Sequence, residues 1–194
     1  MSRGASRREV EIKLPVKDAS AARRLLLAQG FRLRRRRKFE ANALFDTPER
    51  SLTKAGKLLR VRRFGKDCLL TYKGPAGRGR HKVRREIEVG VAEPGSAVEI
   101  LRALGFEVIF RYEKYRAEYA DPDGKGLATV DETPIGVFME LEGEPEWIDR
   151  TARRLGFDES DYITETYAEL YLGAGGSGDM VFGRDGANSL GGTP

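Results

Sequence analysis

Apolar and polar residues alternate one by one along much of this chain. Across residues 9–13, Glu9, Glu11 and Lys13 would share one face of a β-strand and Val10 and Ile12 the other, because successive strand side chains point to opposite faces. The same alternation returns in several later segments. We therefore predict strands over residues 8–14, 31–46, 58–64, 68–73, 82–89, 106–120, 127–131 and 137–142.

Helices are expected between these strands. Pro15 and Asp18 open a segment with one apolar stripe, and Gly30 ends it, which predicts a helix to about Gln29. Further helices are predicted over residues 96–104, 145–155 and 165–171, with a loop or helical turn before residue 56. Residues 1–7 and 173–194 are polar or Gly-rich, which predicts a flexible leader and a disordered tail.

These elements predict the fold class. Eight strands, joined mostly by short connections such as Gly65-Lys66-Asp67, favour an antiparallel sheet. A length of 194 residues suits one domain with a single core. We predict an α+β domain over residues 8–172, built on a closed eight-stranded antiparallel β-barrel with helices packed outside.

The polar faces of the predicted strands carry charged residues at positions i and i+2. Apolar faces turned into the barrel would leave these charges in solvent. However, the helices need apolar surface to cover, so we expect the charged faces to point inward and line a polar tunnel. Beyond the first strand, the charged positions are Arg60, Arg62, Lys73, Glu86, Glu88, Lys114, Arg116, Asp131, Glu140 and Glu142.

Composition narrows the classes of protein. Charged residues make up 34% of the chain and its net charge is +5, which favours an anionic partner. Cys68 is the only cysteine, so neither an intrachain disulfide nor a thiolate metal site can form. The sequence shows no export signal and no apolar run of about 18 residues. We expect a cytoplasmic protein without a membrane segment.

The tunnel charges suggest a chemistry. Arg and Lys side chains bind phosphate oxygens through charge-assisted hydrogen bonds. The carboxylates would repel phosphate unless they held hard divalent cations such as Mg²⁺ or Mn²⁺, which accept oxygen ligands and bridge to phosphate. The pattern therefore predicts a metal-dependent triphosphate site.

The ordered set of charged positions resembles a known family. Glu9-x-Glu11-x-Lys13, Phe45-Asp46-Thr47-Pro48, Leu59-Arg60-Val61-Arg62, Lys73, Glu86-x-Glu88, Lys114-x-Arg116, Asp131 and Glu140-x-Glu142 are similar to the CYTH superfamily of triphosphate tunnel metalloenzymes. The resemblance covers about residues 8–172 and is strongest to bacterial sequences grouped as class IV adenylate cyclase-like. The superfamily also includes thiamine triphosphatases and inorganic tripolyphosphatases.

The resemblance implies roles for individual residues. Glu9, Glu11 and Glu142 would be the principal metal ligands, completed by Glu140 and Asp131. Glu86 and Glu88 would serve a second metal or orient nearby cations. Glu9, Glu11, Lys13 and Glu142 would form the catalytic set. The triphosphate would be bound by Lys13, Arg60, Arg62, Lys73, Lys114 and Arg116.

Three functions stay open at this point. The first is a hydrolase acting on inorganic or organic triphosphate, which we favour because it needs only the tunnel and the metal. The second is a class IV adenylate cyclase that converts ATP to cyclic AMP and pyrophosphate. The third is a noncatalytic barrel that binds polyphosphate or nucleic acid, against which the carboxylates argue. The basic run at residues 32–38 has no interleaved aromatic residues, so a role in steering anions is favoured over nucleic-acid binding. The sequence also leaves open a homodimer.

Overall fold

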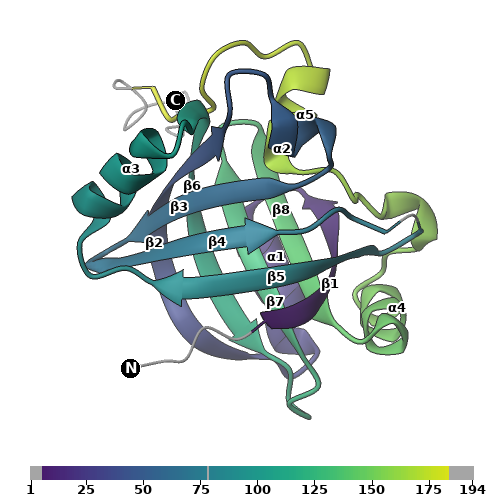
Figure 1. Ribbon diagram of the computed structural model, residues 1–194. Helices are drawn as coiled ribbons and strands as arrows, with labels where there is room; N and C mark the ends of the chain where they lie inside the picture. The colour runs from purple at the N-terminus through teal and green to yellow at the C-terminus, as the bar shows by residue number, and fades with distance from the viewer. Residues whose placement is uncertain (1–5, 78, 184–194) are drawn as a thin grey trace, which may run out of the picture.

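The computed structural model describes residues 6–77 and 79–183, and its strands close into one antiparallel barrel (Figure 1). The strands pair in the order β1-β5-β4-β3-β2-β6-β7-β8, and β8 returns to β1. This confirms the predicted fold class. The strands are β1 (Ser6–Val16), β2 (Arg32–Asp46), β3 (Leu58–Phe64), β4 (Asp67–Lys73), β5 (Lys82–Gly90), β6 (Glu107–Ala120), β7 (Gly126–Thr133) and β8 (Gly136–Gly143).

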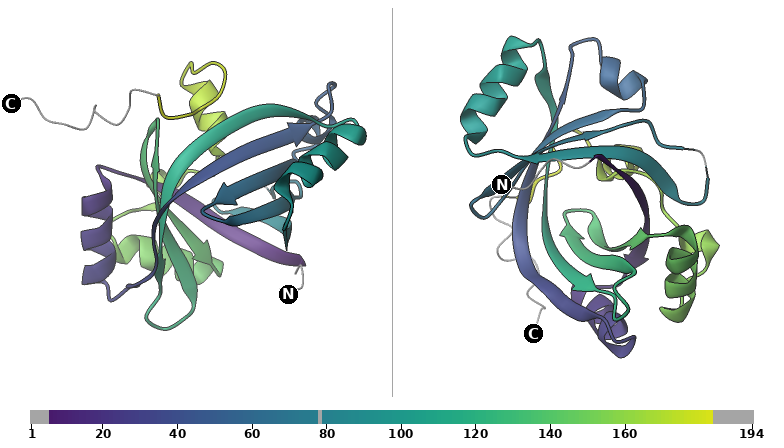
Figure 2. Two further views of the ribbon diagram at one scale, coloured as in Figure 1. Left: turned by 90° about the vertical axis from the view of Figure 1, so that its left-hand side faces the viewer. Right: turned by 60° about the horizontal axis from the view of Figure 1, so that its bottom comes forward.

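The helices lie outside the barrel wall, with α1 and α3 on opposite sides (Figure 2). They are α1 (Ala19–Ala28), α2 (Ser51–Lys54), α3 (Pro94–Ala103), α4 (Pro145–Arg154) and α5 (Tyr167–Gly173), together with the 3₁₀ turn η1 (Glu159–Asp161). Across the described ranges, none of these helices has the length and apolar character needed to cross a membrane.

The main hydrophobic core lies between the barrel wall and helices α1 and α4. Ile12 of β1 and Leu141 of β8 are fully buried there, as are Leu26 of α1 and Ile148 of α4. Because the apolar strand faces are covered by these helices, the polar faces of the same strands point into the barrel. The predicted inward orientation of the charged faces is thus confirmed.

A second apolar cluster closes one end of the barrel, where α5 lies (Figure 1). It consists of Leu44, Phe110, Tyr112, Phe138, Tyr167 and Met180. The ring of Tyr167 packs edge-on against Phe138, with 5.6 Å between ring centroids. We call this cluster the apolar plug.

The segment after α5 differs from the disordered tail that we expected from residue 173. Met180 is fully buried, its backbone amide donates to the Arg111 carbonyl at 2.9 Å, and its carbonyl accepts from the Glu113 amide at 2.9 Å. The physical reason is a free strand edge, because β6 pairs with β7 only from Tyr115 onward. The disorder prediction rested on the low apolar content of residues 173–194, and it overlooked the single buried residue Met180. The expectation for residues 184–194 lies outside the described residues.

Several boundaries differ from the sequence expectations by one or two residues, and two of them have a clear local cause. β1 begins at Ser6, inside the expected leader, because the residues Ser6–Val10 already pair with β5. The terminal helix begins at Tyr167, two residues later than predicted, because Thr166 and Glu169 form a capping box. Residues 1–5 of the expected leader lie outside the described ranges.

Candidate active site

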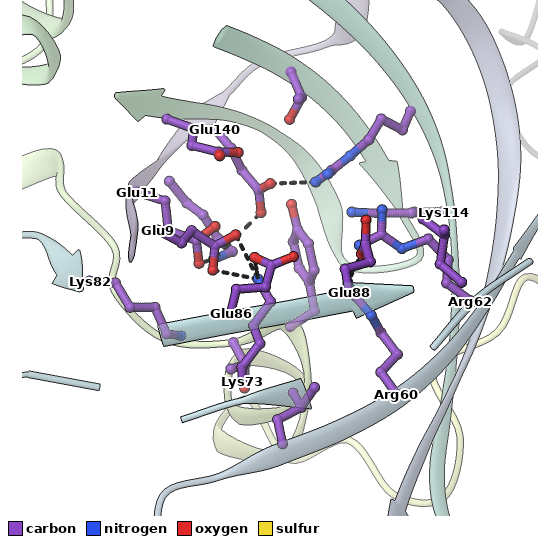
Figure 3. Close-up of a pocket in the computed structure, with 18 of the residues that line it drawn as sticks. Glu9, Glu11, Arg60, Arg62, Lys73, Lys82, Glu86, Glu88, Lys114 and Glu140 are labelled. Carbon is purple, nitrogen blue, oxygen red and sulfur yellow. Dashed lines mark hydrogen bonds and ion pairs between the residues drawn. The ribbon is translucent and has the colours of Figure 1, made fainter. Parts of the chain in front are cut away.

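The barrel encloses a charged cavity of about 360 Å³, to which all eight strands and α5 contribute (Figure 3). Strand alternation delivers a side chain to this cavity at every second position. Every site residue predicted from the sequence lines the cavity except Asp131, which lies fully buried behind it. We call this cavity the tunnel.

Carboxylates gather where β1 meets β8. Glu11 lies directly opposite Glu142 in the strand register, and Glu9 precedes Glu11 on the same face. Lys73 contacts both oxygens of Glu9, at 2.7 and 2.5 Å. On the side facing solvent, Arg7 donates to Glu142 at 2.6 Å. These acids are therefore held by cations from β4 and from the start of β1.

The pKa of Glu142 is raised to about 6. Burial is the main cause, and repulsion from the neighbouring carboxylates Glu9 and Glu11 adds to it, while the Arg7 guanidinium opposes the rise. Arg7 and Lys73 thus offset only part of the rise in this pKa that burial and the neighbouring carboxylates cause. A raised carboxylate pKa inside a cavity is typical of functional sites.

Asp131 organises the cationic side of the tunnel from behind its lining. Its carboxylate accepts from Lys114 at 2.8 Å, from Arg116 at 2.6 and 2.5 Å, and from the Tyr167 hydroxyl at 2.7 Å. Arg116 also contacts Glu140, and despite burial these cations hold the pKa of Glu140 well below its usual range. With its oxygens engaged this way, Asp131 is placed to orient Lys114 and Arg116.

Three arginines at the tunnel have buried Nε atoms that keep unused donors. Within the described part of the chain, the Nε atoms of Arg60, Arg62 and Arg84 find no hydrogen-bond partner. Arg60 donates instead through its terminal nitrogens, to the Tyr112 hydroxyl at 3.2 Å and to Thr71 at 3.3 Å. A buried donor without a partner is costly. This cost would be removed by an anionic ligand with many acceptor oxygens.

The acidic group fits a hard divalent cation by its donor chemistry. Glu9, Glu11 and Glu142 supply only carboxylate oxygens, which Mg²⁺ and Mn²⁺ prefer. Among residues 6–77 and 79–183, no three acidic, histidine or cysteine side chains are arranged so that they could hold an ion. In this structure Glu9 is paired with Lys73 and Glu142 with Arg7. Burial is the main cause of the raised pKa of Glu142, and repulsion from Glu9 and Glu11 adds to it; a bound cation would relieve that repulsion.

The sequence analysis missed Lys82 and Arg84, which also line the tunnel. Both lie on the same face of β5 as Glu86 and Glu88, so continuing the alternation two steps backward would have found them. The pKa of Lys82 is lowered to about 7, mainly by burial and in addition by the neighbouring cations Lys13 and Arg84. Other lining residues missed were Arg7, Tyr112 and Tyr167. Glu40 and Asn42 of β2 are buried between β3 and β6 and do not belong to the lining.

The basic run at the start of β2 lies at the open end of the tunnel. Arg34 and Arg35 line the tunnel there; Arg34 is exposed to solvent and Arg35 is half-buried. Arg35 is paired with Glu118 at 2.8 Å, and Arg37 with Glu132 at 2.6 Å. The position of Arg34 and Arg35 at the tunnel lining is suited to attracting anions toward the tunnel.

Comparison with known proteins assigns the chain to a family. Residues 7–167 match the CYTH domain. This chain belongs to the CYTH family. A Methanocaldococcus jannaschii protein that is provisionally named an adenylate cyclase is 31% identical over 135 residues, which cover 69% of this chain and 75% of that protein.

Solved structures of similar proteins agree with the CYTH barrel. The PH1819 protein of Pyrococcus horikoshii has a TM-score of 0.74 and 28% identity, over 86% of this chain and 99% of that one. A Hippeastrum protein, provisionally named an adenylyl cyclase and described as having a dominant triphosphatase activity, has a TM-score of 0.63 and 21% identity, over 87% and 97%. Members of the CYTH family are enzymes, so the tunnel is the candidate active site of this one.

Proposed function

We propose that this CYTH protein is a divalent-metal-dependent hydrolase of inorganic or organic triphosphate. The observation that carries the proposal is that the tunnel lining offers both a set of cationic side chains and a set of carboxylates. Arg60, Arg62, Lys114 and Arg116 supply cationic groups for phosphate oxygens, and Glu9, Glu11 and Glu142 supply oxygens for a cation. Phosphoryl transfer needs mainly alignment and charge neutralisation, and this arrangement offers both.

The roles of the protein groups follow from their contacts. Arg60 and Arg62 would bind phosphate through their free Nε donors, while Asp131 keeps Lys114 and Arg116 in fixed orientations. Glu9, Glu11 and Glu142 would hold Mg²⁺ or Mn²⁺, which when bound neutralises phosphate charge and lowers the pKa of a coordinated water. The apolar plug excludes solvent from the inner end of the tunnel, which strengthens these electrostatic interactions.

Class IV adenylate cyclase is the second candidate, supported by the names of similar proteins. In cyclisation, the ribose 3′-hydroxyl of ATP would attack the α-phosphorus. The reaction therefore needs a pocket that binds adenine. On β3, the aromatic ring at the tunnel lining is that of Phe64, which is buried, and the Arg35 guanidinium lies over it at 5.4 Å from the ring centroid. This contact favours hydrolysis over cyclisation.

A product assay separates the candidates. Purified protein is incubated with tripolyphosphate or with ATP, each with Mg²⁺ or Mn²⁺, and phosphate, pyrophosphate, ADP and cyclic AMP are resolved. We expect orthophosphate from tripolyphosphate and no cyclic AMP from ATP. Cyclic AMP with equimolar pyrophosphate would instead establish the cyclase.

A substitution tests the site itself. Glu11→Gln removes one charged carboxylate and keeps its shape, so the barrel should fold while metal-dependent turnover falls by more than about tenfold. Glu99→Gln on the exposed side of α3 is the control, because Glu99 is remote from the tunnel lining. Full activity of Glu11→Gln would contradict the assignment.

A further inference from the structure

A second cavity opens beside the tunnel, where β1 and β8 separate. β1 pairs with β8 only from Glu11 onward, and the residues before it pair with β5 alone. β8 ends at Gly143, which pairs with Gly126 at the start of β7. The space between these strand ends has a volume of about 320 Å³. We call it the mouth notch.

The mouth notch carries an excess of positive charge. Arg7, Arg8, Arg34 and Lys125 line it, against the carboxylates Glu142 and Glu144. Four cations and two carboxylates leave two positive charges in excess. Glycines at the ends of β7 and β8 form part of the wall. These features suit an anion with several oxygen atoms.

The mouth notch is continuous with the open end of the tunnel, since Arg7, Arg34 and Glu142 line both cavities. The opposite end of the tunnel is closed by the apolar plug, where Tyr112 and Tyr167 reach the lining. A linear ligand too long for the tunnel therefore has to extend through the open end. On that route it passes the mouth notch.

We propose that the mouth notch binds the fourth and later phosphoryl units of a linear inorganic polyphosphate. This inference rests on the proposed function and extends its substrate class beyond tripolyphosphate. The described residues that line the notch include no aromatic side chain, so a nucleobase has no ring to stack on there. Several guanidinium groups and one ammonium group around one cavity can bind the repeated charges of a polyphosphate chain.

The test removes two cations that line only the mouth notch. Arg8→Gln with Lys125→Gln is compared with wild type for binding of tripolyphosphate, tetrapolyphosphate and a longer chain, by calorimetry in EDTA and by steady-state hydrolysis with Mg²⁺. We expect affinity for the longer chains to fall about fivefold or more, and affinity for tripolyphosphate to change less than about twofold. Arg63→Gln with Lys66→Gln removes the same two residue types from the β3–β4 hairpin and should change neither.

Two results would overturn the proposal. An equal loss for all chain lengths would mean that the two cations act only through the overall field, and an unchanged affinity for long chains would mean that the notch holds no phosphate. Failure of the proposed function is a separate result. In that case wild type would hydrolyse none of the chains, whereas the length-dependent difference in binding could still be measured.

Discussion

At the scale of single residues, Glu142 makes both the stability of the protein and its affinity for metal depend on pH. Its pKa is raised to about 6 from an ordinary 4.5, so the folded state binds this proton more tightly than the unfolded chain does. The stability of the metal-free protein should therefore fall as pH rises from 4.5 to about 6, because of this group. Metal binding needs the ionised carboxylate, so metal affinity should weaken as pH drops below about 6.

Replacing this carboxylate with an amide should separate stability from activity. At about pH 8 in EDTA, Glu142→Gln should raise the free energy of unfolding by up to about 2 kcal/mol, and at about pH 4 it should bring no gain. Metal-dependent turnover should fall by more than about tenfold. Urea unfolding at both pH values measures the first effect. A stability gain that persists at the lower pH would contradict the raised pKa.

Lys82 should report ligand binding through a proton. Its pKa of about 7 means that much of the ammonium is deprotonated above that pH in the free protein. A bound polyanion would raise the pKa and draw a proton from the buffer. Calorimetry of tripolyphosphate binding at about pH 8, in two buffers of different ionisation enthalpy, should show more proton uptake for wild type than for Lys82→Arg, because an arginine stays charged. Equal uptake by the two proteins would contradict this role.

At the scale of elements, two glycines let α4 pack against the strand ends. Gly126 of β7 and Gly143 of β8 are register partners, and a Cβ atom built at either would lie 2.4 or 2.7 Å from the Trp147 ring. Trp147 itself is buried in the main core. The absence of side chains at these two positions thus makes room for the indole ring on the sheet.

An added methyl group should disturb this packing. Gly126→Ala would push the Trp147 ring out of its place and should lower the free energy of unfolding by about 1–3 kcal/mol. Gly95→Ala on α3 is the matched control, because a Cβ there meets no atom within 4 Å. Thermal unfolding of both variants, followed by Trp147 fluorescence, measures the difference. An unchanged midpoint of thermal unfolding for Gly126→Ala would show that α4 can shift away from the sheet without loss of stability.

Much of the barrel could be predicted from the alternation of residues along its strands. Where that prediction failed, the failure has a physical cause. Alternation placed Glu9, Arg60 and Glu140 on inward faces because a strand keeps its period of two. The rule fails at the start of β2, where register shifts around Arg35 bring both Arg34 and Arg35 to the tunnel lining. Ion-pair partners such as Lys73 with Glu9 come from strands distant in sequence, so the pattern alone did not reveal them.

At the scale of the whole molecule, the protein balances many buried charges of both signs around one cavity. Buried ion pairs lose hydration, so the empty tunnel is not a strong source of stability. A ligand that satisfies the free donors of Arg60, Arg62 and Arg84 binds only the folded state. The same holds for a divalent cation at Glu9, Glu11 and Glu142. Ligand and metal should therefore stabilise the fold together.

This coupling gives a thermal-shift prediction. Tripolyphosphate with Mg²⁺ should raise the midpoint of unfolding by more than the sum of the shifts that each produces alone, because the cation neutralises carboxylates that would repel phosphate. Glu11→Gln with Glu142→Gln should abolish the excess and keep part of the shift from tripolyphosphate alone. Na⁺ at equal ionic strength controls for screening. A purely additive response in wild type would mean that metal and phosphate do not meet in the tunnel, and the proposed roles of its cationic side chains and carboxylates would have to be abandoned.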